Sequence, residues 1–318
     1  MRKFIISDLH GNGEVYDSVM AFLESVSTLE EVELYINGDF IDWGFDSYRM
    51  LMDIQKRIQE KGNVKIHYLG GNHEWLLFQA MKNRTSHEPI SCWDFWIENG
   101  GWAVEGEMDT FLGDDGYETA CKTLKDFTGS LKIIHVFDEK ILQKPILLVH
   151  GQAPLKVDSA RELKIEDDNE EVLNAVWKSE DEMDSVFGLF VVGKNRIGNP
   201  DYFTICGHCP VDKKEGFVHR IRENDSYFNI DGGCHPYAVG KLEYDHVPLV
   251  EVKDGYLDIL VFNHNNQITS GYHFDGKTIP MEEIELNINR LHLNPQLNGN
   301  GEKNKQLILE LIRDGVYS

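Results

Sequence analysis

Basic residues are scarce in this chain. Its 318 residues contain 31 lysines and arginines against 54 aspartates and glutamates, which gives a formal net charge of −23. A field of that sign repels the phosphate backbone of nucleic acids and anionic membrane surfaces. We therefore expect no nucleic-acid partner and no membrane partner.

Long apolar runs and a dense set of cysteines are also missing. The first apolar stretch is interrupted at Asp8, too early for a signal-peptide core, and no run is long enough to cross a bilayer. The five cysteines are an odd number in a long chain, which favours reduced thiols over a disulfide framework. We expect a cytoplasmic protein.

Short apolar runs are present instead, and their pattern is typical of an α/β fold. They are rich in β-branched and aromatic residues and predict buried strands at residues 4–6, 34–36, 64–69, 146–149, 203–205 and 227–230. Amphipathic stretches at residues 15–26 and 46–61 separate the early runs and predict β-α-β units. Two later runs, 247–252 and 256–262, are joined by a short turn and predict antiparallel strands that complete the sheet.

The acidic excess is concentrated in two segments, residues 105–118 and 158–184. Such charge runs usually form solvated surfaces, so we assign them no catalytic role. The chain from 75 to 130 shows little regular periodicity, and the stretch 294–304 is rich in glycine and asparagine. We expect one catalytic domain over residues 1–293, followed by a polar linker and a short tail over residues 294–318.

Side chains that bind metals follow five of the predicted strands. In chain order they are Asp8 and His10, Asp39 and Asp42, Asn72 and His73, His150, and His208. Sites in open α/β sheets lie outside the carboxyl ends of the strands. Oxygen ligands mixed with imidazoles suit Mn²⁺, Fe or Zn²⁺, and their number exceeds what one ion requires. We predict two divalent metal ions per chain, with Mn²⁺ as the first expectation and Fe or Zn²⁺ as alternatives.

The order of these residues forms a series of motifs. The series is Asp8-Leu9-His10-Gly11, Gly38-Asp39-Phe40-Ile41-Asp42, Gly71-Asn72-His73-Glu74, His150-Gly151 and Gly207-His208-Cys209-Pro210. It resembles the signature of the calcineurin-like metallophosphoesterases. The final Gly-His-x-Pro, together with residues 96–101 and 229–234, is similar to the branch of bacterial serine/threonine protein phosphatases, lambda phosphatase and symmetrical diadenosine tetraphosphatases. The resemblance is strongest over residues 4–243.

The resemblance implies a fold and two ion sites. The implied fold is an α/β four-layer sandwich of two central mixed β-sheets flanked by helices. One ion would be held by Asp8, His10 and Asp39. The second would be held by Asp39, Asn72, His150 and His208, so that the Asp39 carboxylate bridges the two ions.

The resemblance also implies a reaction. Hydroxide held between the ions would attack the phosphorus of a phosphate ester in line. His73 would be the general acid that protonates the leaving oxygen, and Asp42 would hold its ring by a hydrogen bond. Glu74 would orient the neighbouring loop.

One position departs from the protein-phosphatase pattern. Trp43 follows Asp42, where those enzymes have an arginine that grips the phosphate with both arms of its guanidinium. The phosphate-binding cation is therefore unknown. Lys178 and Arg196 are candidates, and the sequence also offers Arg49, Arg161 and Lys194.

The substrate stays open at this point. A serine/threonine phosphoprotein is the first expectation, and a dinucleoside polyphosphate or a phosphodiester is the alternative. A non-catalytic binding protein on the same scaffold is a distant third. The phosphorylated substrate is the only partner that we predict, and the oligomeric state is open.

Two features have competing interpretations. Cys206-Gly207-His208-Cys209 could be a thiol-disulfide exchange motif, but such a motif should open a helix near the start of its domain. We therefore prefer His208 as a metal ligand. The tryptophans at 93, 96 and 102 could form a stacking wall for a nucleobase or a peptide side chain, although core packing is the more usual role of such rings.

Overall fold

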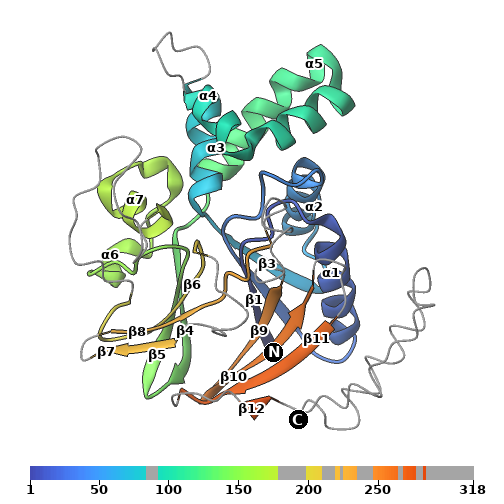
Figure 1. Cartoon of the computed structure of the whole chain (residues 1–318). Coiled ribbons are helices and arrows are strands. Elements are labelled where there is room, and N and C mark those ends of the chain that lie inside the picture. Colours follow the sequence, from blue (N-terminus) through green and yellow to red (C-terminus); the bar gives the residue numbers. More distant parts are fainter. Residues whose placement is uncertain are drawn as a thin grey trace.

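Two mixed β-sheets form the centre of the protein, and helices flank them (Figure 1). The computed structural model describes residues 1–83, 92–177, 198–209, 219–222, 225–234, 246–263, 268–276 and 282–283. The predicted α/β fold with two mixed sheets is confirmed. The expected boundary at residue 293 and the linker and tail that follow it lie outside the described residues.

The larger sheet has seven strands in the order β12-β11-β10-β9-β1-β2-β3. Their bounds are β1 (Arg2–Ile6), β2 (Val32–Asn37), β3 (Val64–Leu69), β9 (Val247–Lys253), β10 (Tyr256–Phe262), β11 (Ile268–Phe274) and β12 (Glu282–Glu283). The first three strands pair in parallel, and β9 joins β1 in the antiparallel sense. The hairpin predicted at 247–262 is therefore confirmed and extends the sheet.

The smaller sheet has five strands in the order β4-β5-β6-β8-β7. Their bounds are β4 (Ile134–Ile141), β5 (Lys144–Val149), β6 (Phe203–Cys206), β7 (His219–Arg222) and β8 (Asp225–Asn229). Strands β5, β6 and β8 are parallel, and the two edge strands are antiparallel to their neighbours. The carboxyl ends of the parallel strands in each sheet carry the residues that the sequence singles out.

Helices connect and cover the strands. Their bounds are α1 (Gly13–Ser27), α2 (Ser47–Glu60), α3 (Asn72–Lys82), α4 (Cys92–Trp96), a wide π-helical turn η1 (Ile97–Gly101), α5 (Trp102–Gly129), α6 (Val157–Ala160), a 3₁₀ turn η2 (Ile165–Asp167) and α7 (Glu170–Trp177). In Figure 1, α1 and α2 lie on one side of the molecule, α6 and α7 lie on the other, and α3, α4 and α5 form a projecting group above the sheets. Within the described chain, no helix combines the length and the apolar character needed to cross a membrane.

The alternation of side chains along the strands separates two hydrophobic layers. In β1, Phe4 and Ile6 belong to the core on the helix side, whereas Ile5 between them belongs to the core between the sheets. In β5, Leu147 belongs to the first layer and Leu148 to the second. Both faces of these central strands are buried, which explains why their sequences are continuous apolar runs.

The region from 75 to 130, whose sequence shows little regular periodicity, is nevertheless largely helical. Helices occupy most of the described part of this region, and the acidic segment 105–118 lies on α5. The periodicity is broken because the chain changes direction inside the helical region. Gly100 has φ +94° in the wide turn, and Gly113 has φ +60° at a kink within α5. Glycine adopts such angles without a steric penalty.

Candidate active site

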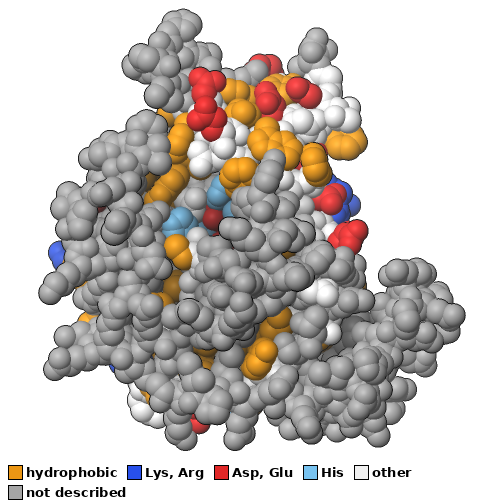
Figure 2. Space-filling model, viewed as in Figure 1, with side chains coloured by type: hydrophobic (Ala, Val, Ile, Leu, Met, Phe, Trp, Pro, Cys, Tyr) orange, Lys and Arg blue, Asp and Glu red, His pale blue; other side chains and the backbone are white. Residues whose placement is uncertain are grey.

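The predicted metal ligands meet at the carboxyl ends of strands from both sheets. Asp8 follows β1, Asp39 follows β2, Asn72 begins α3 after β3, His150 follows β5 and His208 follows β6. All of these side chains are buried except His208, which is half-buried, and His10 is buried beside them. Figure 2 shows histidine and acidic side chains near the middle of one face, with hydrophobic side chains beside them.

Asp39 is the centre of this cluster. Its Oδ2 lies 3.3 Å from Nε2 of His150, 3.8 Å from Nε2 of His10 and 3.9 Å from Nε2 of His73. Two compact groups of ligand atoms result, Asp39 with His10 and His73, and Asp39 with His150 and His208. The carboxylate of Asp39 is therefore shared between two potential ion positions.

The electrostatics of the cluster favour cations. Burial alone would lower the pKa of His150, but Asp39 and Asp8 raise it to about 10. Burial opposes ionisation of Asp39, yet the neighbouring imidazoles of His150 and His73 hold its pKa well below the ordinary value. The same field that attracts a proton to His150 attracts a divalent cation.

The Asn72 side chain is directed into the second group. Its Oδ1 lies 2.8 Å from Nδ1 of His208 and 3.1 Å from Nε2 of His150. The opposite orientation of the amide would direct its nitrogen at the same two rings and at Asp39. An amide oxygen that faces imidazole nitrogens and a carboxylate fits a shared cation, because a cation attracts the lone pairs of all of these groups.

Asp8 provides a second indication of a cation. Its Oδ1 accepts a hydrogen bond from the backbone N–H of His208 at 3.1 Å. Its Oδ2 is buried and has no hydrogen-bond partner among the described residues. Burial, followed by the charge of Asp231, raises the pKa of Asp8 well above the usual value. A buried carboxylate oxygen normally has a hydrogen-bond donor or a cation beside it, and the carboxylate, amide and imidazole groups around Asp8 suit a metal ion.

Glu74 fixes the loops that carry the ligands. Its buried carboxylate accepts four hydrogen bonds, from the backbone N–H groups of Asp39, Phe40 and Gly71 at 2.8–3.0 Å and from the Tyr68 hydroxyl at 2.7 Å. The expected role in orienting a neighbouring loop accords with this geometry. Glu74 joins the loop after β2 to the loop after β3, and therefore acts on both sides of the cluster.

His73 is held by a buried hydrogen-bond chain. Its Nδ1 lies 2.9 Å from Oδ2 of Asp42, and Nε1 of Trp96 donates to both Asp42 oxygens at 3.1 Å. Burial raises the pKa of Asp42 to about 6. Burial would lower the pKa of His73, but Asp39 and the hydrogen bond with Asp42 raise it to about 9. Asp42 therefore favours the protonated form of the His73 imidazole.

The backbone around the site has an unusual conformation. The residues Asp8, His10, Asp39, Asp42, Trp43 and His208 all have positive φ between 45° and 74°. Such angles strain residues that carry a Cβ, and strain of this kind gathers at functional sites. At Gly38, which has φ +82°, an added Cβ would lie 2.6 Å from Cα of Gly71. The loops after β2 and β3 can approach each other because both positions are glycine.

Asp231 was not among the predicted site residues. It is buried just after β8, and its Oδ1 accepts the backbone N–H of Gly233 at 2.8 Å. Burial and the charge of Asp39 raise its pKa to about 7, against the lowering by the Gly233 hydrogen bond. The rule that found the other residues, a polar side chain after a buried strand, could have found this one.

The phosphate-binding cation is not identified. Arg49 is held by Asp17 and Asp46, and Arg161 lies 3.5 Å from Asp158 on the surface. The candidates Lys178 and Arg196, together with Lys194, lie outside the described residues. Trp43 follows Asp42 in the chain, and its ring packs against Gly100, where an added Cβ would lie 2.5 Å from the ring.

The Cys206-Gly207-His208-Cys209 segment begins at the last residue of β6, and within the described residues it does not open a helix. None of the five cysteines, all of which lie in the described part of the chain, forms a disulfide.

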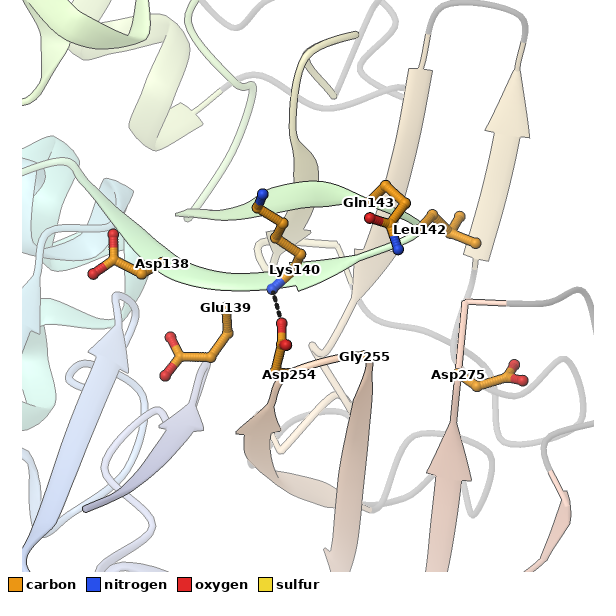
Figure 3. Close-up of a pocket in the computed structure, with 8 residues that line it drawn as sticks. All are labelled: Asp138, Glu139, Lys140, Leu142, Gln143, Asp254, Gly255 and Asp275. Carbon is orange, nitrogen blue, oxygen red and sulfur yellow. Dashed lines mark hydrogen bonds between the residues drawn. The ribbon is translucent and has the colours of Figure 1, made fainter.

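A separate cavity of about 870 Å³ lies at the other end of the strands (Figure 3). It is lined by the β4–β5 turn and the β9–β10 turn, and Asp254 accepts the backbone N–H of Lys140 at 3.1 Å. Four of its eight lining residues are acidic, so it disfavours a phosphate ligand. The cavity contains none of the clustered histidines.

The fold and the cluster define a phosphoester hydrolase, and the sequence comparison identifies its family. The model of the calcineurin-like phosphoesterases matches residues 1–279. The chain therefore belongs to this family, whose members depend on two metal ions. The predicted family and the predicted class of enzyme are confirmed.

Solved structures with similar folds include several phosphatases. A cold-active protein-tyrosine phosphatase from a psychrophilic Shewanella species is 16% identical, with 86% of this chain and 80% of that chain covered and a TM-score of 0.43. A protein serine/threonine phosphatase from Saccharomyces cerevisiae is 14% identical, with 88% and 81% covered and a TM-score of 0.48. A putative diadenosine tetraphosphatase is 16% identical, with 82% and 93% covered and a TM-score of 0.39. No curated protein sequence matches the chain significantly.

Proposed function

We propose that the protein hydrolyses phosphate monoesters with two divalent metal ions, and that serine/threonine phosphoproteins are its substrates. The observation that carries this proposal is the position of Asp39, whose Oδ2 lies 3.8 Å from the imidazole of His10 on one side and 3.3 Å from that of His150 on the other. A carboxylate shared in this way is the feature that a two-ion centre needs.

The ligand sets divide at Asp39. Asp8 and His10 complete the first set, and Asn72, His150 and His208 complete the second. Carboxylate, amide and imidazole ligands together suit Mn²⁺, with Fe or Zn²⁺ as the other possibilities. When bound, the ions polarise the phosphoryl oxygens and lower the pKa of water, so that in-line attack on phosphorus proceeds near neutral pH. A manganese enzyme with free cysteines accords with a reducing compartment such as the cytoplasm.

His73 supplies the proton for the leaving oxygen. Its Nδ1 is engaged by Asp42, so the proton available for transfer is on Nε2, which faces Asp39 at the centre of the site. Asp42 keeps the ring in this orientation and stabilises its protonated form. Glu74 holds the loop that carries Asp39 and the loop before Asn72 in fixed positions during the reaction.

The charge of the metal centre explains how a protein with a large negative net charge can bind an anionic substrate. Asp8 and Asp39 are part of the acidic excess, but two divalent ions bound there would reverse the sign of the local field. The acidic segment 105–118 lies on α5, in the group of helices that projects above the sheets (Figure 1).

A dinucleoside polyphosphate is the second candidate substrate, because half-buried aromatic rings are grouped close to the site residues in the sequence. The ring centroids of Trp75 and Trp177 lie 5.9 Å apart, and Phe95 stacks on Trp177 at 6.4 Å. Trp75 is two residues beyond His73 on α3, and Phe95 precedes Trp96, which contacts Asp42. Exposed faces of such rings can stack on a nucleobase.

A rate comparison tests the proposal. The chain is stripped with a chelator, reloaded with Mn²⁺, and assayed with a phosphoserine peptide, diadenosine tetraphosphate and bis(p-nitrophenyl) phosphate. We expect the phosphopeptide to react fastest, and expect Asp39→Asn to slow this reaction by about 10³-fold. Asp126→Asn, at an exposed carboxylate, is the matched control.

Each outcome has a distinct meaning. A clear preference for diadenosine tetraphosphate would contradict the proposed phosphoprotein substrate but would leave the proposed two-ion hydrolase intact. Full activity in the metal-free chain, or unchanged activity in Asp39→Asn, would contradict the two-ion centre itself.

A further inference from the structure

Trp96 is the largest fully buried side chain of the described residues, and it does more than fill the core. Its indole Nε1 donates to both oxygens of Asp42 at 3.1 Å, and Oδ2 of Asp42 also lies 2.9 Å from Nδ1 of His73. The three side chains form one continuous chain from the core to the metal centre. They come from α4, the loop after β2 and α3, so the chain is assembled only in the folded protein.

The indole suits this position chemically. Asp42 has no exposed surface and its backbone has φ +70°, so the carboxylate can neither rotate into water nor relax by a small movement of the chain. An indole N–H only donates, and it does not titrate in the working range of a protein. It therefore holds Asp42 without competing for the proton of His73.

The surroundings fix the direction of the indole. The ring lies so close to Gly101 that a Cβ at that position would collide with it, and Trp93 packs edge-on against it with ring centroids 5.1 Å apart. Trp96 is also the last residue before the wide turn η1, whose Gly100 accepts the backbone N–H of Trp43 at 3.0 Å. The fold of residues 96–101 thus directs the indole N–H of Trp96 at the carboxylate of Asp42.

We propose that Trp96 is a positioning residue for proton transfer, which acts on His73 through Asp42. This inference rests on the proposed function, since it presumes that His73 protonates the leaving oxygen. With the indole donor absent, the Asp42 carboxylate loses the contact that holds it toward Nδ1 of His73, and the imidazole loses its fixed orientation. The rate should then fall most for substrates whose leaving oxygen must be protonated.

A leaving-group comparison in the full chain loaded with Mn²⁺ tests this role. Phenyl phosphate has a leaving oxygen that needs a proton, whereas p-nitrophenyl phosphate has one that needs little help. We expect Trp96→Phe to lower kcat by about 10-fold to 100-fold for phenyl phosphate, the range expected for a hydrogen bond to a charged group. For p-nitrophenyl phosphate we expect a loss of less than about 3-fold. Trp102→Phe is the matched control, because it makes the same change at an indole that packs on Phe45 instead of holding Asp42.

A second arm separates positioning from packing. In a His73→Asn background, Trp96→Phe should have no further effect on either substrate, and the metal content should stay at the wild-type value. Should Trp96→Phe fold poorly, Trp96→3-benzothienylalanine removes the donor and keeps the ring shape, and the same leaving-group signature is expected from it.

The outcomes distinguish the inference from the proposed function. Equal losses on both substrates, or a further loss in the His73→Asn background, would show that Trp96 only packs the core, even if His73→Asn itself discriminates between leaving groups. If His73→Asn shows no such discrimination, the general-acid role fails, and the role of Trp96 fails with it.

Discussion

Glu74 accepts the backbone N–H of Asp39 at 2.9 Å, and so ties the shared carboxylate of the metal centre to helix α3. The other oxygen of Glu74 accepts from Phe40 and Tyr68, and both oxygens are buried. Each oxygen of the Glu74 carboxylate therefore accepts two hydrogen bonds. A substitution that keeps the size of the side chain but replaces an acceptor by a donor should destabilise the protein.

We expect Glu74→Gln to destabilise the metal-free protein by about 2–4 kcal/mol, because the new amide NH₂ faces donors in place of an acceptor. Chemical denaturation measures this change, and titration calorimetry should show weaker Mn²⁺ binding. Glu60→Gln, at an exposed carboxylate that lies 3.8 Å from Nζ of Lys56, should change stability by less than about 1 kcal/mol. Equal stability of the two variants would contradict the claim that Glu74 joins the loops after β2 and β3.

The close approach of the loops after β2 and β3 gives a second prediction. A Cβ at Gly38 would lie 2.6 Å from Gly71, at a backbone φ of +82°. Gly38→Ala should therefore reduce the free energy of unfolding by about 2–4 kcal/mol. At Gly62 an added Cβ meets nothing within 4 Å, so Gly62→Ala should stay within about 1 kcal/mol of the wild type. A tolerant Gly38 would mean that the two loops are less tightly joined than their geometry indicates.

The pH dependence of the reaction should reveal the charge of His73. Its pKa is raised to about 9 by Asp39 and Asp42, against the effect of burial, so the protonated acid is present below that value and is lost as pH rises through it. Bound cations repel the proton and bring the loss to lower pH. We expect the rate with phenyl phosphate to fall on the alkaline side, and expect this fall to be absent in His73→Asn. A fall of the same shape in both proteins would assign it to another group.

Several elements could be predicted from the sequence because local signals agreed with the tertiary structure. Asp8, Asp39 and Asn72 each follow a short strand rich in apolar residues, and the parallel pairing of β1, β2 and β3 brings these residues to one edge. The metal-binding residue types then indicated the chemistry. The roles of the individual ligands remain predictions.

Other parts depended on contacts that no local pattern carries. Trp96 and Asp42 are 54 positions apart, and their hydrogen bond depends on how α4 packs on the loop after β2. The helical nature of residues 102–129 is obscured in the sequence by glycines and by an acidic segment that fits a solvated helix face as well as a loop. Asp231 was quoted within a motif, but its burial beside the charges of Asp8 and Asp39 appears only in the folded chain.

The central claim is that Asp39 lies between two ions, and anomalous diffraction from Mn²⁺-loaded crystals tests it most directly. We predict two manganese peaks per chain, about 3.5–4 Å apart, one beside Asp8 and His10 and the other beside Asn72, His150 and His208. Asp39→Asn should weaken both peaks together. A single peak in the wild-type protein, or two peaks of undiminished occupancy in Asp39→Asn, would contradict the account.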